Sequence, residues 1–131
     1  MIERKSHNWR RKGLLVLSGF VAIGLLSAYL GVSAWIGTDV RRISVDAMQR
    51  YEGDAVEALM EQVGDSARPL ADRNEAVWAL GQMGDSRALQ VLQHYSTGGP
   101  CHHETALCER ELAKAIKHLE GGLNVTALVW R

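Results

Sequence analysis

The chain has 131 residues, of which 47% are hydrophobic, and its 15 basic and 15 acidic residues give a formal net charge of zero. This length is typical of about one ordinary domain. A neutral charge balance offers no electrostatic footprint for a nucleic acid, so we expect no nucleic-acid partner.

Residues 14–36 contain no charged side chain and predict a transmembrane helix. At about 1.5 Å per residue, a helix of this length exceeds the ~30 Å hydrocarbon core of a bilayer. A signal peptide also combines a basic start, an apolar run and a small-residue site, here ending at Ala34. Its apolar run is typically only about 7 to 15 residues long, so we favour a retained anchor in contact with the lipid bilayer.

The charges that flank this span predict its orientation. The basic residues of the arm formed by residues 1–13 are Arg4, Lys5, Arg10, Arg11 and Lys12, and those that follow the span are Arg41, Arg42 and Arg50. The excess on the N-terminal side places the arm in the cytoplasm and everything after Gly37 in the periplasm or another extracytoplasmic space. Trp9 and Trp35 bracket the span, and their amphipathic indole rings suit the two membrane interfaces.

Small residues recur at helical spacing within the span, at Gly24, Ser27, Ala28, Gly31 and Ala34. Helices that associate in lipid do so by close backbone approach along such stripes. The stripe therefore favours packing against an integral membrane protein subunit. The alternative is that glycine and alanine are simply frequent in membrane helices.

Beyond Gly37 the apolar residues recur with a period near 3.6. Residues 73–83 place one such face at Ala76, Ala79, Leu80 and Met83. Gly84 then supplies a helix end, and Asp85 or Ser86 supplies a new N-cap. The pattern resumes over residues 86–95 at Ala88, Leu89, Leu92 and Tyr95, which predicts a hairpin of two helices.

This hairpin recurs within residues 37–122. The first helix of the hairpin corresponds to Ser44, Ala47, Met48 and Tyr51 before it and to Leu112, Ala115, Ile116 and Leu119 after it. The second helix corresponds to residues 55–63. A repeat of about 30 to 40 residues made of two helices is typical of an α-solenoid.

The segment RNEAVWALGQMGDSRALQVL resembles the HEAT-like repeat of the phycobilisome-lyase type. The matching positions are Arg73, Ala76, Ala79, Leu80, Gly81, Gly84, Asp85, Ala88 and Leu92. The resemblance implies a HEAT-like α-helical fold. Together with the predicted span and the recurring hairpin, we expect an all-α chain in which one transmembrane helix precedes a short HEAT-like solenoid of about two and a half hairpins. It implies no reaction, because such repeats occur in enzymes, adaptors and scaffolds alike.

The two cysteines of the chain, Cys101 and Cys108, flank two histidines. Residues 104–122 are predicted to form the closing helix, with Glu104 and Thr105 near its start. Within one helix the cysteines would lie ~10 Å apart along the axis, beyond the ~7 Å limit for a disulfide. Gly99 and Pro100 instead place Cys101 in the preceding loop, from which it can reach Cys108 in the first turns of the helix.

Three states of this cysteine segment remain open. Paired thiols in an exported domain generally oxidise, so we favour a disulfide between Cys101 and Cys108. A zinc site built from Cys101, His102, His103 and Cys108 is an alternative, although the segment lacks the usual ligand spacing. Free thiols are the third state. We expect no cofactor beyond this alternative metal.

The apolar residues of the tail formed by residues 123–131 have no evident role inside a solenoid. The tail can fold back, contact a partner, or lie at the membrane surface with Trp130 at the interface, and we favour a partner or the membrane.

The chain contains no carboxylate pair, nucleophile–base set or phosphate loop that would support catalysis, so we expect no enzyme activity. The sequence therefore predicts a membrane-anchored helical-repeat interaction module, acting as an accessory or scaffold subunit of a larger membrane complex. The alternative is a Cys/His-based metal-binding or redox-sensing membrane protein.

Overall fold

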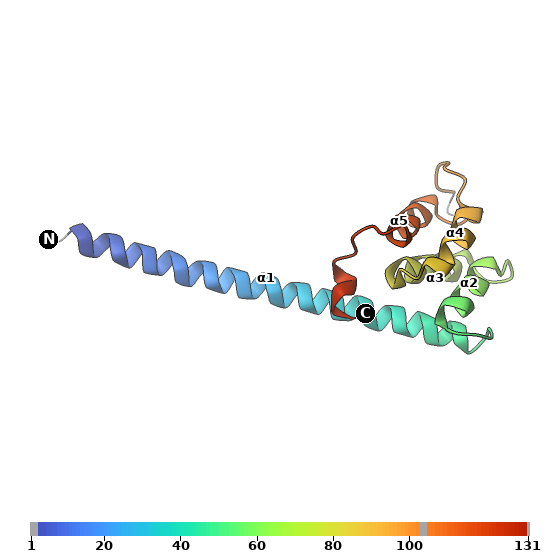
Figure 1. The fold of residues 1–131 in the computed structure, drawn as a ribbon, viewed down its shortest axis with the longest axis horizontal. Helices are drawn as coiled ribbons and strands as arrows, with labels where there is room; N and C mark the ends of the chain where they lie inside the picture. The colour runs from blue at the N-terminus through green and yellow to red at the C-terminus, as the bar shows by residue number, and fades with distance from the viewer. Residues whose placement is uncertain (1–2, 103–104, 131) are drawn as a thin grey trace.

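A computed structural model describes residues 3–102 and 105–130, and of residues 3–8, 10 and 11 it describes the backbone only. The described residues form helices and no strand, which confirms the all-α fold. The helices are α1 (Glu3–Met48), α2 (Ala55–Gly64), α3 (Leu70–Met83), α4 (Leu89–Tyr95) and α5 (Glu109–Leu119), with 3₁₀ turns η1 (Ser86–Ala88) and η2 (Thr126–Val129). Figure 1 shows α1 projecting from a cluster formed by the shorter helices.

The long helix α1 combines the predicted span and the first helix of the repeat domain. Its 46 residues extend over about 69 Å at the usual helical rise. The segment Lys12–Met48 contains an apolar window with a mean hydropathy of 2.1, none of which is buried. By length and composition, α1 is therefore a candidate membrane span.

The C-terminal part of α1 packs against the repeat domain. Val40, Ile43 and Ala47 are buried there, and the Ser44 hydroxyl lies 3.9 Å from the Met83 sulfur of α3. The expected inner positions Ser44 and Ala47 are therefore confirmed. Met48 was wrongly assigned to this face, because it is 42% exposed and lies about 100° around the helix from Ala47.

The helix α2 begins at a capping box and packs against α3. The Asp54 carboxylate accepts the backbone N–H groups of Val56 and Glu57, and the Glu57 carboxylate accepts the Asp54 N–H. The Arg73 side chain of α3 donates a 2.9 Å hydrogen bond to the carbonyl oxygen of Val63 in α2. Leu59 and Leu80 are fully buried in the core that these helices share.

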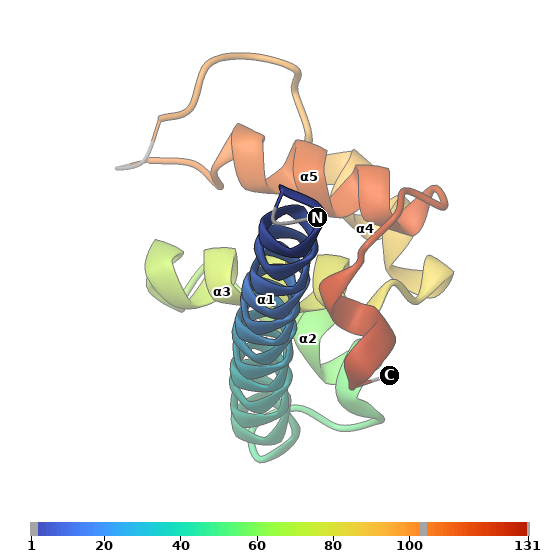
Figure 2. The same ribbon diagram turned by 90° about the vertical axis from the view of Figure 1, so that its left-hand side faces the viewer.

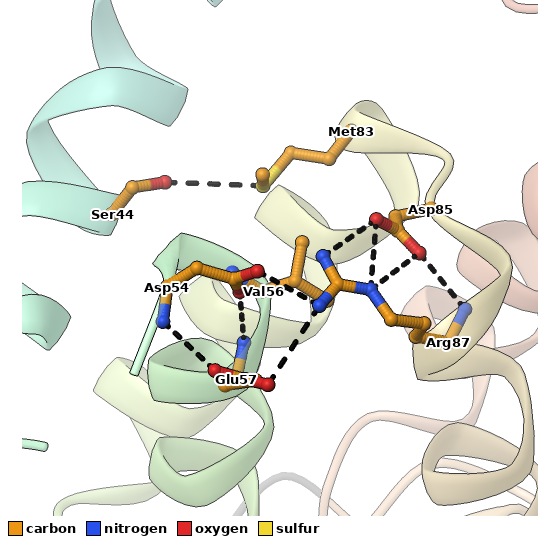
Figure 3. A network of polar contacts seen from close by, with 7 residues as sticks. All are labelled: Ser44, Asp54, Val56, Glu57, Met83, Asp85 and Arg87. Atoms are coloured by element: carbon orange, nitrogen blue, oxygen red, sulfur yellow. Dashed lines mark hydrogen bonds and ion pairs between the residues drawn. The ribbon is translucent and has the colours of Figure 1, made fainter. Parts of the chain in front are cut away.

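The predicted hairpin of residues 73–95 is present, with its turn at Gly84 and Asp85. Gly84 has a left-handed φ of 64° and its N–H caps α3 at the Leu80 carbonyl, which explains why glycine is needed there. The Asp85 carboxylate accepts the Arg87 N–H at 3.0 Å, as expected of an N-cap. The Arg87 guanidinium bridges Asp85 and Asp54, and so joins this turn to the start of α2 (Figure 3).

The helix α5 closes the array and packs against α3 and α4. A Cβ atom placed on Gly81 would lie 2.7 Å from both Cα and Cβ of Ala115, so α3 and α5 approach closely at a glycine. Leu112, Ala115 and Leu119 are buried, as the repeat pattern predicted. The array thus comprises the end of α1 with α2, then α3 with α4, then α5.

The predicted start of the closing helix was wrong. α5 begins at Glu109, Thr105 lies in a turn, and Cys108 is the N-cap with an extended backbone. The Cys108 N–H donates a 2.8 Å hydrogen bond to the Asn74 side-chain oxygen of α3, and Leu107 is buried. These tertiary contacts hold Leu107 and Cys108 extended, so the helix does not start at Thr105; Glu104 lies outside the described residues.

Candidate functional site

The two cysteines meet where the loop after α4 joins α5. The sulfur atoms of Cys101 and Cys108 lie 3.2 Å apart, and both residues are free thiols in the structure. Cys108 is buried and Cys101 is half-buried. The Arg110 N–H donates to the Cys101 sulfur at 3.3 Å, and this bond, followed by the contact with the Cys108 thiol, lowers the pKa of Cys101.

The Glu109 carboxylate, in the first turn of α5, binds the start of the loop that follows α4. It accepts hydrogen bonds from the Ser96 hydroxyl, from the Thr97 N–H at 3.1 Å and from the Gly98 N–H at 2.8 Å. These donors, the Ser96 hydroxyl first, lower the pKa of Glu109. The sequence pattern did not assign this role to Glu109, although an acidic residue in the first turn of a helix is a usable signal.

The zinc site built from the two cysteines and the two histidines between them stays a prediction. His103 lies outside the described residues, and His102 is exposed in the loop. Within residues 3–102 and 105–130, no group of three or more Cys, His, Asp or Glu side chains is arranged to hold a metal ion.

The small-residue stripe lies on an uncovered side of α1. A Cβ atom added at Gly24 or Gly31 would meet nothing within 4 Å, and Ser27, Ala28 and Ala34 are exposed. At about 100° per residue, Gly24, Ala28 and Gly31 point roughly away from the side of α1 that carries Ser33 and Gly37. The chain itself therefore leaves the side of these three residues free among the described residues. Ala34 lies closer to the side of Ser33 and Gly37 and lines a cavity together with Trp130.

The opposite side of α1 is covered by the tail, which folds back from α5 (Figures 1 and 2). The Tyr29 hydroxyl donates a 2.6 Å hydrogen bond to the Val125 carbonyl oxygen, and Ser33 is fully buried. A Cβ atom on Gly37 would lie 2.7 Å from Cγ of Trp130, so the indole sits directly on this glycine. The sequence favoured a partner or the membrane over this folding back.

The three tryptophans proposed as interface anchors differ in their surroundings. Trp9 and Trp35 are 84% and 66% exposed on α1. Trp130 is half-buried beside a cavity of about 550 Å³, and its indole N–H is buried with no hydrogen-bond partner among the described residues. The side chains of Arg4, Lys5, Arg10 and Arg11, on which the orientation depends, lie outside the described part of the chain.

An acidic depression of about 940 Å³ lies between the α1–α2 loop and the end of α2, a feature that the sequence pattern did not indicate. Tyr51 and Met60 line it together with four acidic side chains, Glu52, Glu57, Glu61 and Asp65. The Tyr51 hydroxyl donates a 2.7 Å hydrogen bond to the Asp65 carboxylate. Burial and this carboxylate raise the pKa of Tyr51, whereas the same hydrogen bond lowers the pKa of Asp65.

The comparisons with known proteins bear on the α3–α4 hairpin. The profile of the family described as PBS lyase HEAT-like repeat matches residues 72–96, which run from the first turn of α3 to the residue after α4. The chain therefore carries a HEAT-like repeat at this hairpin, within an all-helical fold. No curated protein and no solved structure matches it significantly. HEAT-like repeats stack helix pairs and generally mediate protein–protein interaction, and the stacked helices of the repeat domain share this architecture.

Proposed function

We propose that this HEAT-like protein is a membrane-anchored interaction module and a non-catalytic accessory subunit of a larger membrane protein complex. One observation carries the proposal: a repeat domain packs on the C-terminal part of α1, while the apolar window of the same helix remains entirely unburied. An unburied apolar helix of this length is stable in a bilayer. A domain rigidly continuous with it is held at a defined place above the membrane.

The orientation forms part of the proposal. The basic arm stays in the cytoplasm, and the repeat domain lies in the periplasm or another extracytoplasmic space, as the flanking charges favour. Protease treatment of sealed right-side-out membrane vesicles tests this arrangement. We expect the repeat domain to be digested and an epitope on the arm to be protected, and the reverse pattern would overturn the orientation.

The experiment that tests the subunit role is purification of the native protein in mild detergent, with mass spectrometry of the proteins that copurify. We expect a stoichiometric membrane complex. The matched variants Gly31→Leu and Gly19→Leu locate the contact, because both glycines have open space around them but face different sides of α1. Gly31→Leu should release the complex and Gly19→Leu should retain it, whereas recovery of the protein alone from native membranes would argue against the proposal.

The cysteine geometry favours a second candidate function, a redox sensor. The two sulfur atoms lie 3.2 Å apart, and the pKa of the Cys101 thiol is lowered by the Arg110 N–H and the Cys108 thiol, so the two thiols are placed to pair on oxidation. The double variant Cys101→Ser, Cys108→Ser separates the two functions. An interaction module should lose stability yet still assemble with its complex in gentle conditions, whereas a sensor should fold and assemble but lose its response to oxidants.

A further inference from the structure

The polarity of the tail is the reverse of that of a soluble surface segment. Its polar side chains turn inward: the Asn124 amide donates a 2.8 Å hydrogen bond to the Gln82 side chain of α3, and the Thr126 hydroxyl donates to Asn124 at 2.9 Å. Four of its apolar side chains turn outward, whereas Trp130 packs on Gly37. The exposed fractions of these four side chains are 79% at Leu123, 52% at Val125, 73% at Leu128 and 42% at Val129.

The backbone of the tail also satisfies a polar group of α1. The Val125 carbonyl oxygen accepts a 2.6 Å hydrogen bond from the Tyr29 hydroxyl. This polar group in the apolar stretch of the helix is therefore paired within the protein. Polar groups that enter hydrocarbon must be paired within the protein, and apolar groups need no such partner. The pairing of Asn124, Thr126 and Tyr29 is what an environment poorer in water than the surface of a soluble domain favours. The buried Ser33 hydroxyl and Trp130 N–H have no partner among the described residues.

The position of the tail along α1 indicates what this environment is. The tail contacts residues 29–37, and Tyr29 lies about 10 Å before Ile36, the end of the predicted span. Exposed apolar side chains of α1 continue around the helix at the same level, at Leu30, Val32 and Trp35. Arg41 and Arg42 are exposed about one turn beyond, where they can reach lipid phosphates.

We propose that the tail is a second membrane-contacting element, which lies in the interfacial layer of the bilayer beside the outer end of the span. This inference rests on the proposed membrane anchor. Leu128 and Val129 are exposed in η2, which packs against α1 beside the exposed apolar side chains of that helix. The occupant that fits them is therefore the upper acyl region of the same leaflet. Lipid contact at both α1 and the tail fixes the rotation of α1 about its own axis. It thereby also fixes which side of the repeat domain faces the membrane.

The experiment uses the full chain in nanodiscs of phosphatidylcholine, doped with a phosphatidylcholine whose acyl chain carries a diazirine near its carbonyl end. After illumination, tryptic peptides are searched for lipid adducts. The arrangement of lysine and arginine in the sequence separates three peptides. Residues 13–41 report the span, residues 118–131 report the tail, and residues 88–110 report a part of the repeat domain away from the membrane.

We expect adducts on the first two peptides and none on the third. Adducts on the span without adducts on the tail would overturn this inference and leave the anchor intact. Absence of adducts from the span would overturn the anchor and the tail contact together. Adducts of equal yield on residues 88–110 would overturn the arrangement of the domain above the membrane.

Matched variants add a second measurement. Leu128→Glu places a charge at an exposed tail position and should lower the adduct yield on residues 118–131 about fivefold, because a charge in this layer is unfavourable. Gln90→Glu, at an exposed position of α4, should change neither yield. An unchanged tail yield in Leu128→Glu would contradict a lipid contact at this residue.

Discussion

The Tyr29 hydroxyl donates a 2.6 Å hydrogen bond to the Val125 carbonyl oxygen, and so joins the apolar stretch of α1 to the tail. The substitution Tyr29→Phe removes this donor and keeps the ring. A hydrogen bond contributes about 1 kcal/mol net, so we expect the amides of residues 126–130 to exchange about fivefold faster in hydrogen exchange mass spectrometry. The amides of α2 serve as the internal control, and unchanged exchange in the tail would show that this bond does not hold it.

The contact of Trp130 with Gly37 gives a steric test of the same docking. The substitution Gly37→Ala places a methyl group 2.7 Å from Cγ of Trp130, so the tail must shift away from α1. We expect faster exchange of the tail amides and easier proteolytic removal of residues 123–131. Gly31→Ala, which meets nothing within 4 Å, should leave the tail protected, and equal effects of both variants would refute the specific contact.

The close approach of α3 and α5 depends on Gly81. A methyl group in Gly81→Ala would lie 2.7 Å from Cα of Ala115, so the helices must separate. Overpacking of this kind costs about 1–3 kcal/mol, which exceeds the gain of about 1 kcal/mol in helix propensity. Urea unfolding in detergent should show net destabilisation. Gly64→Ala in α2 is the matched control, because its nearest contact of 3.4 Å is ordinary, and an equally stable Gly81→Ala would argue against close packing.

The Glu109 carboxylate makes the loop that carries Cys101 sensitive to acid. Its pKa is below the ordinary 4.5 because the Ser96 hydroxyl and the Gly98 and Thr97 N–H groups donate to the ionised form. A lowered pKa in the folded state adds stability above the ordinary value, and this stability is lost as the pH falls through the folded value. Hydrogen exchange of residues 96–100, corrected for intrinsic rates, should therefore increase below about pH 4.5.

A variant tests the origin of this pH dependence. Glu109→Gln removes the charge and should open the loop already at neutral pH, with little further change on acidification. Glu75→Gln, at an exposed position of α3, is the matched control and should behave like the unmodified chain. A loop whose acid response persists in Glu109→Gln would assign the response to another group.

The position of the two thiols predicts an intramolecular disulfide when the full chain is treated with oxidised glutathione, which accepts the two electrons and two protons released. Peptide mapping without reductant should find Cys101 linked to Cys108, because their sulfur atoms already lie 3.2 Å apart. In the chain-entropy account, a loop this short gains about 2 kcal/mol of stability. Urea unfolding of the oxidised chain measures this gain. Glutathione adducts on both cysteines in place of the cross-link would contradict the prediction, and Cys108→Ser is the control that cannot form it.

The repeat domain could largely be predicted because its helices are short amphipathic units with local signals. Gly84 and Asp85 mark the turn by backbone conformation and capping, and Ala76, Ala79 and Leu80 mark the buried face by their spacing. Predictions failed where contacts between distant segments decide the outcome. The bond from the Cys108 N–H to Asn74 delays the start of α5 until Glu109, and no local preference of residues 104–108 indicates it.

The sequence by itself determined the all-helical class, the apolar length of the candidate span and the HEAT-like repeat, because each of these depends on composition or short-range periodicity. Only the tertiary structure decided that the tail returns to α1 at Tyr29 and Gly37, and that Gly24 and Gly31 of the small-residue stripe stay uncovered. The apolar residues of the tail have no strict period, so their spacing does not indicate which part of the protein they pack against. That choice depends on the hydrogen bond from the Tyr29 hydroxyl to the tail and on the packing of the Trp130 indole on Gly37. These contacts join segments far apart in the chain, so they form only when the chain folds.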